Sequence, residues 1–220
     1  MSPPQLTLLQ TGGARAMPND GARIEGDAYY TSPRLARSIV SEVQRFIKEP
    51  IDGVVLEPSV GGGAFATAIL DLTPARLMVA DIDPTAPGMA TGWWSRRRAA
   101  GERYPLAFYT RQSFLDLDHL RPGWVIGNPP YADALAHVEH ALAIAPRVVF
   151  LLRLAFTESI GRIGFWKTAR LRHLWVLAKR PSFTASGKTD ACPYAVFFWD
   201  RDHVGEPTMT PCWDWQGVSR

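Results

Sequence analysis

The chain of 220 residues has only two cysteines, Cys192 and Cys212, too few for a disulfide framework or a cysteine metal cluster. No apolar run is long enough to cross a bilayer, and the N-terminus lacks the basic-then-apolar order of a secretory signal. No lysine follows the glycine-rich segment at 61–63, as it would in the phosphate-binding loop of an NTPase. We therefore expect a cytoplasmic protein without a metal or a membrane span.

The overall composition is that of an ordinary globular domain. Its length suits one domain with a single sizeable core, and the sequence shows no internal repeat and no linker. The net charge of +3 and the pI near 9.0 are compatible with nucleic acid as a partner but do not indicate it alone. We expect a flexible leader at 1–28, a folded domain at 29–203 and a tail at 204–220.

Short apolar runs alternate with segments of helical spacing along the folded part. The runs lie at 53–56, 76–80, 106–109, 124–127 and 148–152, and the main helical segments at 33–46, 64–72 and 132–145. The segment at 85–102 is partly helical in this interpretation, and 159–170 is a short basic helix or loop. A last pair of runs at 174–179 and 194–199 suits an antiparallel hairpin. The alternation favours an α/β fold with a parallel sheet and helices on both faces. Ligands of such sheets bind beyond the carboxyl ends of the strands.

The most informative motif is Asn128-Pro129-Pro130-Tyr131, which directly follows an apolar strand. The two prolines fix their own φ angles, and Pro129 pushes Asn128 towards an extended conformation. The motif therefore predicts a stiff corner that holds an amide, a backbone carbonyl and an aromatic ring together. Such a set suits a planar ring with an exocyclic amine, because two oxygens can accept its N–H groups while the aromatic ring stacks.

A second motif, Gly61-Gly62-Gly63, lies at the first strand-to-helix turn. Glycines there let the backbone approach a ligand that a Cβ atom would block. Asp81 ends the next strand about 20 residues later, where a carboxylate can accept the hydroxyls of a ribose. The turn lacks the full dinucleotide fingerprint, so it indicates a nucleoside cofactor of a class that the spacing alone leaves open.

The motifs together resemble one known family. They are Tyr30-Thr31-Ser32-Pro33, the stretch 56–65 around the glycines, Asp81-Ile82-Asp83-Pro84, Ser113-Phe114-Leu115 and Asn128-Pro129-Pro130-Tyr131, in that order. In these the chain resembles the S-adenosylmethionine-dependent adenine-N6 DNA methyltransferases, over about residues 29–200. The resemblance implies a class I methyltransferase, Rossmann-like fold with a mostly parallel seven-stranded sheet and a closing antiparallel hairpin.

The resemblance also implies roles for individual residues. Asn128, Pro129, Pro130 and Tyr131 would form the catalytic corner. The implied cofactor-binding residues for S-adenosyl-L-methionine are Tyr30, Thr31, Pro33, Glu57, Pro58, Ser59, Gly61, Gly63, Phe65, Asp81, Ile82, Ser113, Phe114 and Asn128. The chain departs from the family at Ser113, where members usually carry the aspartate that accepts the adenine amine of the cofactor.

The implied substrate is DNA, with a target adenine swung out of the stack. Tyr131 and Phe183 would stack on the base, with Phe183 in a segment that looks like the closing hairpin of the family. Arg153, Arg162 and Lys188 would bind the substrate, since basic residues after the fifth strand suit phosphate contacts.

Other readings of the same corner stay open. A protein methyltransferase that acts on a glutamine amide and an RNA adenine or guanine methyltransferase would both use it. A cytosine-N4 enzyme more often has serine at 128, and a catalytically silent binding module has no need of the intact corner. The compact build suggests short or low sequence specificity, as in a phage or mobile-element enzyme of a restriction-modification type. The oligomeric state is not predicted.

Overall fold

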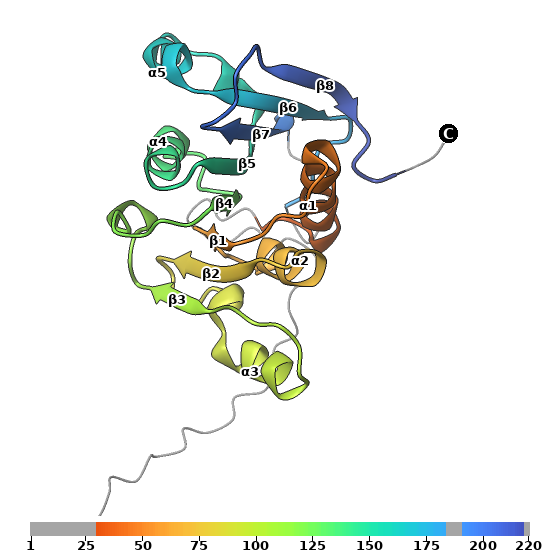
Figure 1. The fold of residues 1–220 in the computed structure, drawn as a ribbon, viewed down its shortest axis with the longest axis vertical. Helices are drawn as coiled ribbons and strands as arrows, with labels where there is room; N and C mark the ends of the chain where they lie inside the picture. Colours follow the sequence, from red (N-terminus) through yellow and green to blue (C-terminus); the bar gives the residue numbers. More distant parts are fainter. Residues whose placement is uncertain (1–29, 184–190, 218–220) are drawn as a thin grey trace, which may run out of the picture.

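A computed structural model describes residues 30–183 and 191–217, and its core is one twisted sheet (Figure 1). The strand order is β3-β2-β1-β4-β5-β7-β6-β8. The strands are β1 (Val54–Glu57), β2 (Arg76–Asp81), β3 (Ala107–Thr110), β4 (Trp124–Gly127), β5 (Arg147–Arg153), β6 (Leu171–Leu177), β7 (Tyr194–Asp200) and β8 (Thr208–Trp213).

All neighbouring strands run parallel except at β7, which is antiparallel to both β5 and β6. The predicted α/β class, the mostly parallel sheet and the closing hairpin are therefore confirmed. The strand count was wrong, because the sheet has eight strands instead of seven. The extra strand β8 comes from residues that we expected in the tail, and it pairs in parallel with β6.

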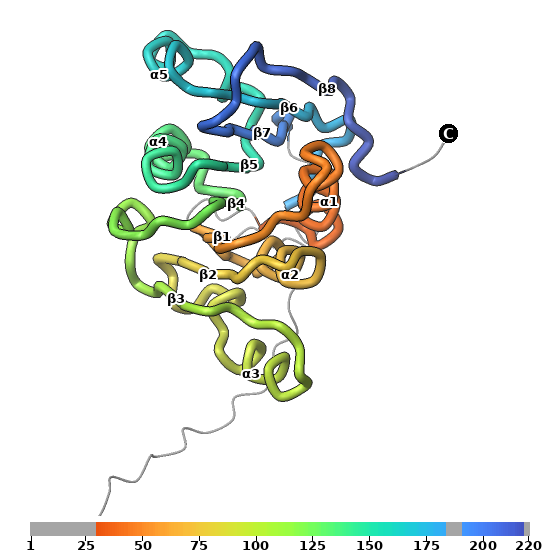
Figure 2. The backbone as a smooth tube through the Cα atoms, viewed as in Figure 1, coloured from red at the N-terminus to blue at the C-terminus, as the bar shows by residue number. Residues whose placement is uncertain are grey.

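Helices cover both faces of the sheet, as the trace in Figure 2 also shows. The helices are α1 (Pro33–Ile47), α2 (Ala64–Leu72), α3 (Thr91–Ala99), α4 (Ala134–Ile144) and α5 (Ile163–Thr168), with short 3-10 turns η1 (Pro87–Met89), η2 (Phe114–Asp116), η3 (Leu154–Thr157) and η4 (Ile160–Arg162). Side chains alternate along the strands, so that Leu77 and Val79 pack with α1 and α2 while Met78 and Ala80 pack on the side of α4. Both faces are therefore buried, as expected for parallel strands.

Helix α1 begins where the sequence predicts. Ser32 is its N-cap, with Oγ accepting the N–H of Leu35 at 3.3 Å, and Pro33 occupies the first turn. The motif that precedes α1 is thereby held at a defined helix start. Within the described ranges, no helix is long and apolar enough to cross a membrane.

The C-terminal segment is fastened to α1. The Trp215 side chain is buried, and its Nε1 donates to the Lys179 carbonyl at 2.8 Å, while its own carbonyl accepts the Ser38 hydroxyl at 2.8 Å. Arg34 also donates to the Gln216 carbonyl. Trp215 therefore joins α1 to the segment that follows β8.

We expect Trp215→Ala to lower the free energy of unfolding by about 3 kcal/mol, because a large buried side chain and its hydrogen bond are lost. Such a loss lowers Tm by about 6–12 °C in a protein of this size. Thermal unfolding checks the result. Met209→Ala, at an exposed position of β8, should change stability by less than about 0.5 kcal/mol. Equal stabilities of the two variants would show that Trp215 does not anchor α1.

Candidate active site

The predicted corner lies at the carboxyl end of β4. Pro129 is buried, Pro130 is exposed, and Asn128 and Tyr131 are half-buried. The Asn128 amide nitrogen donates to the Thr31 hydroxyl at 3.1 Å. That bond joins residues 97 positions apart, so the corner and the segment before α1 form one structure.

The glycine turn follows the carboxyl end of β1, on the neighbouring strand. Gly61 and Gly63 have φ angles of 46° and 78°, and Gly63 is the N-cap of α2. Side chains other than glycine rarely adopt such angles, so the turn requires glycine at both positions. The Tyr30 ring lies on this turn, since a Cβ atom on Gly61 would stand 3.0 Å from two of its carbons.

One small pocket brings these segments together. It is lined by Tyr30, Thr31, Glu57, Ser59, Val60, Gly61, Gly62, Ala64, Phe65 and Asn128. Seven of these residues are among those proposed from the sequence, and Val60, Gly62 and Ala64 are additions. Among the other residues, Pro33 starts α1 in an exposed position, and Pro58 packs against the end of β4, 3.2 Å from where a Gly127 Cβ would stand.

Glu57 is the most unusual group in the pocket. Its carboxyl is 1% exposed, and Oε2 has no hydrogen-bond partner among the described residues. Burial, and after it the nearby Asp81 carboxylate, raise the pKa of Glu57 well above its ordinary value, although the backbone N–H of Ala66 acts in the other direction. A buried carboxyl group with one oxygen that lacks a hydrogen-bond partner is suited to a cationic group of a ligand, which would pair with it.

Asp81 supports the glycine turn from the end of β2. Its Oδ2 accepts the Gly61 N–H at 2.8 Å, and its Oδ1 accepts the Asp83 N–H at 3.0 Å. Burial raises the pKa of Asp81, while those two backbone hydrogen bonds lower it. Each carboxylate oxygen can accept a further hydrogen bond. The next residue, Ile82, is 69% exposed and offers an open apolar side chain beside the carboxylate.

Ser113 and Phe114 have internal partners that sequence analysis did not predict. The Ser113 hydroxyl caps η2 by accepting the Leu115 N–H at 3.2 Å. The Phe114 ring is 3% exposed, stacked on His137 at 5.6 Å and edge-on to His140 at 4.7 Å. Burial lowers the pKa of both histidines, so neutral imidazoles pack around this ring.

Tyr131 belongs to an aromatic cluster behind the corner. The Arg153 guanidinium lies over its ring at 5.1 Å, and the rings of Tyr194 and Phe183 are 5.5 Å and 6.4 Å away. Burial is the first cause that raises the pKa of Tyr131 well above its ordinary value, so its hydroxyl stays neutral. Phe183 is 1% exposed, because it packs against Tyr131 and Tyr194. Its ring is therefore not open to a base in this conformation, in contrast to the predicted stacking.

The basic residues that we expected to bind the substrate lie in different environments. Arg153 lies at the corner, as described above. Arg162 donates to the carbonyls of Ala155 and Glu158, so the structure gives it an internal role that the prediction did not include. A further basic residue of this part of the chain, Arg172, pairs with the buried Asp200 at 2.6 Å and is therefore not an open phosphate contact. Lys188 lies outside the described residues.

Gly88 is a supporting residue that sequence analysis missed. Its N–H donates to the Gly61 carbonyl at 2.7 Å, so η1 lies directly against the glycine turn. A Cβ atom at Gly88 would stand 2.7 Å from Val60 and 2.9 Å from backbone atoms of Gly61 and Gly63. The Pro87-Gly88 pair signals a turn in the sequence, but only the fold shows what the turn contacts.

We expect Gly88→Ala to destabilise the fold by about 1–3 kcal/mol, because backbone atoms of the glycine turn cannot yield as a flexible side chain would. Gly92→Ala is the matched control in α3. A Cβ there meets only the end of Arg96 at 3.9 Å, and alanine should stabilise the helix by about 0.5–1 kcal/mol. Urea unfolding of both variants checks the contrast. An unchanged midpoint for Gly88→Ala would contradict the close packing of η1.

The described residues contain no cluster of His, Cys, Asp and Glu that could hold a metal ion. The chain matches no protein family and no curated protein. It is similar in structure to a methyltransferase subunit of a type I restriction-modification system from Streptococcus thermophilus, with a TM-score of 0.66, 12% identity, and coverage of 88% of this chain and 48% of the other. The chain thus spans about half of that subunit.

Two further solved structures are similar. The M protein of the type I restriction enzyme EcoKI has a TM-score of 0.58 and 14% identity, with coverage of 85% of this chain and 49% of that protein. A putative RNA methyltransferase from Pyrococcus horikoshii has a TM-score of 0.59 and 14% identity, with coverage of 79% and 87%. At these identities the comparisons establish the fold, which is the Rossmann-like fold of methyltransferases.

Proposed function

We propose that the chain transfers a methyl group from S-adenosyl-L-methionine to the exocyclic N6 amine of adenine in DNA. The observation that carries this proposal is the shared pocket, in which the glycine turn, the Tyr30-Thr31 segment and Asn128 meet. The fold and the proline corner support it, because they set a nucleoside-type turn beside a corner that suits an amine.

The residues present fit the cofactor. Glu57 offers its buried carboxyl to the amino group of the methionine part, and Asp81 has acceptor capacity left for ribose hydroxyls. The exposed Ile82 side chain would pack on the adenine of the cofactor. When bound, S-adenosyl-L-methionine supplies an electrophilic methyl group on a sulfonium sulfur.

The corner would act on the substrate amine by orientation. The lone pair of the adenine N6 is delocalised into the ring, which makes it a poor nucleophile. If the Asn128 oxygen and the Pro129 carbonyl each accept one N–H, the nitrogen is drawn towards a pyramidal shape and its lone pair becomes available. Those hydrogen bonds strengthen as positive charge develops on the nitrogen, which then loses one proton to solvent.

The Tyr131 ring would hold the base in place. Stacking of a base on an aromatic ring contributes about 1–3 kcal/mol in single-strand binders. Arg153 already lies over this ring at 5.1 Å, so the base would use the remaining ring surface beside the guanidinium. A base inside a duplex cannot reach the corner, and it must first leave the stack.

Methylation of an amine on an RNA base is a second candidate. One observation favours it, namely that the chain covers 87% of the putative RNA methyltransferase but only about half of each restriction-modification subunit. The same corner serves both substrates, so the two candidates differ only in the nucleic acid that reaches it.

Nucleoside mass spectrometry tests the proposal. Cells without their own adenine methylation would express the chain or carry an empty vector, and their DNA and RNA would be digested separately. We expect N6-methyladenine in the DNA of the expressing cells alone. A methylated base in RNA alone would favour the second candidate, and methylation of neither would contradict both.

A further inference from the structure

The loop that follows β5 displays an apolar side chain in an unusual way. Ile160 is 88% exposed, a fraction matched among the large apolar side chains of the described residues only by Val204. The next isoleucine, Ile163, is 51% exposed, and each isoleucine precedes a glycine. A Cβ atom on Gly164 would meet nothing within 4 Å, so the backbone next to Ile163 is not covered by other residues.

Hydrogen bonds and a cation-π contact of Arg162 fix the conformation of this loop, so the exposed position of Ile160 is well defined. Arg162 donates to the carbonyls of Ala155 and Glu158 at 3.0 and 2.9 Å, and its guanidinium lies over the Phe156 ring at 4.7 Å. Phe156 itself is buried in the core. Ser159 adopts a φ of 112°, a strained angle for a residue other than glycine. This bracing fixes the turn that presents Ile160.

The loop also lies at the same edge of the sheet as the catalytic corner. Strands β4 and β5 are parallel neighbours, so Asn128 and Leu154 follow adjacent carboxyl ends. The link is direct, because Arg153, the last residue of β5, lies over the Tyr131 ring. Ile160 follows seven positions later, in the loop that continues from this edge.

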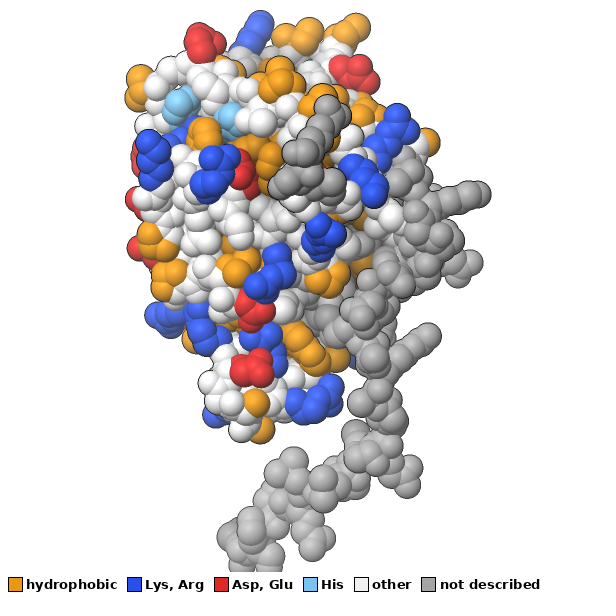
Figure 3. Space-filling view, turned by 90° about the vertical axis from the view of Figure 1, so that its right-hand side faces the viewer, with side chains coloured by type: hydrophobic (Ala, Val, Ile, Leu, Met, Phe, Trp, Pro, Cys, Tyr) orange, Lys and Arg blue, Asp and Glu red, His pale blue; other side chains and the backbone are white. Residues whose placement is uncertain are grey.

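The charge around the loop suits a polyanion. Residues 153–167 carry three basic side chains, Arg153, Arg162 and Lys167, and one acidic side chain, Glu158. An open hollow beside Ile160 is lined by Thr157, Ser159, Ile163, Trp166 and Lys167. By contrast, basic and acidic side chains are interspersed over the side of the molecule that carries α1 and β8 (Figure 3). A basic rim around one apolar tip is what an inserted wedge in nucleic acid requires.

We propose that Ile160 enters the base stack of duplex DNA and occupies the space that the target base leaves. The inference rests on the proposed function and adds to it the residue that keeps the duplex open. Lys167, an exposed basic residue of this loop, would contact a phosphate of the DNA backbone. A single strand has no stack to open, so the wedge matters only for duplex substrate.

The experiment measures methylation of native and heat-denatured DNA by the purified full chain. The DNA comes from cells without adenine methylation, and the readout is N6-methyladenine by mass spectrometry. We expect Ile160→Ser to lower the rate on native DNA at least about tenfold and to change the rate on denatured DNA less than about twofold. A ratio of the two rates is insensitive to a general loss of active protein.

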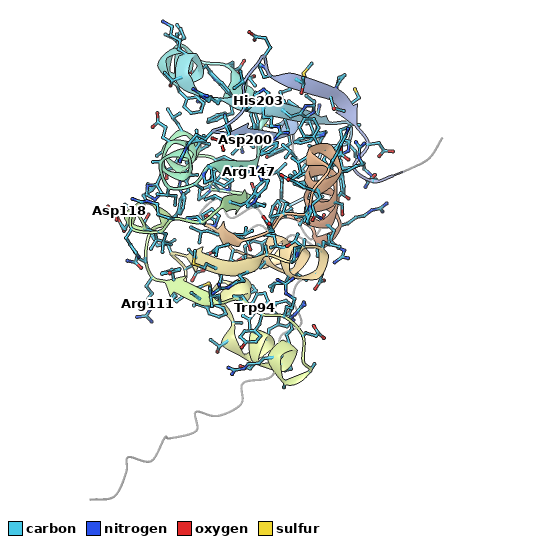
Figure 4. All side chains as sticks on the ribbon, viewed as in Figure 1. Trp94, Arg111, Asp118, Arg147, Asp200 and His203 are labelled. Carbon is cyan, nitrogen blue, oxygen red and sulfur yellow. The ribbon has the colours of Figure 1, made fainter. Side chains whose placement is uncertain are left out.

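Val204→Ser is the matched control. Val204 is equally exposed, but it follows the carboxyl end of β7, which is antiparallel to β5 and therefore ends at the opposite edge. Figure 4 shows that edge, where Arg147 and Asp200 lie together with His203 nearby. This variant should leave both rates unchanged.

The outcomes separate the wedge from the proposed function. Equal loss on native and denatured DNA, or no loss on either, would overturn the wedge and leave DNA methylation standing. No loss of rate on either form of DNA would also fit a loop that docks a protein partner. Failure of the unaltered chain to methylate either form of DNA would overturn the proposed function and the wedge with it.

Discussion

Replacing Asn128 with alanine should lower the rate of methyl transfer by at least about 100-fold, because the corner would lose the oxygen that we propose accepts an N–H of the substrate amine. The affinity for S-adenosylmethionine should change by about tenfold at most. Asn128 lines the pocket and donates one hydrogen bond to Thr31, and a single neutral hydrogen bond contributes about 0.5–1.5 kcal/mol.

Single-turnover kinetics and calorimetric titration measure the two quantities separately. Thr31→Val is the matched control, since it removes the same hydrogen bond from the other side while the Asn128 amide remains. We expect this variant to keep most of its activity. A fall in the rate as large as that of Asn128→Ala would mean that Asn128 only positions the wall of the pocket. Full activity in Asn128→Ala would remove the corner from the chemistry.

Replacing Glu57 with glutamine should weaken S-adenosylmethionine binding by about 30- to 1000-fold, because one partner of a buried charge pair is removed. The volume of the side chain hardly changes, so a loss of packing would not explain the result. Glu139→Gln, at an exposed position on α4, should leave the affinity unchanged. Calorimetric titration checks both variants, and unchanged binding by Glu57→Gln would place the cofactor elsewhere.

The same substitution should make the free protein more stable. The pKa of Glu57 is raised in the folded state, so its contribution to stability is fully present at low pH and is lost as the pH rises through the folded pKa. Glutamine carries no such charge, and Tm should rise by about 2–4 °C for each kcal/mol regained at pH 8. The affinity of the unaltered chain should fall as the pH drops through the same pKa, since the carboxylate becomes protonated. A lower Tm of the variant at pH 8 would contradict the buried charge.

Much of the fold could be predicted because strand and helix patterns differ in period. The runs at 76–80 and 124–127 match β2 and β4 within one residue, and Ser32-Pro33 marks the start of α1. Strand β8 was missed because its residues are half-buried or exposed, and Pro211 interrupts the run. Its place in the sheet depends on β6 and α1, which are distant in the sequence.

The candidate site, like the fold, has parts that the sequence predicts and parts that it does not. Motifs with fixed backbone requirements could be placed, so Gly61, Glu57 and Asn128 line one pocket. The partners of those residues could not be predicted, since they depend on packing between distant segments. Gly88 against the glycine turn and His137 under Phe114 are examples. The burial of Phe183 is a third, because only the fold brings Tyr131 and Tyr194 beside it.

The central claim is that the glycine turn and the proline corner serve one reaction. A crystal structure of the chain with S-adenosylhomocysteine, the demethylated product of the cofactor, tests this claim most directly. We expect the amino group of the ligand within hydrogen-bond distance of Glu57, and its sulfur facing the Asn128 side chain. A ligand bound away from residues 57–65, or an Asn128 side chain closed off from the sulfur, would contradict the account.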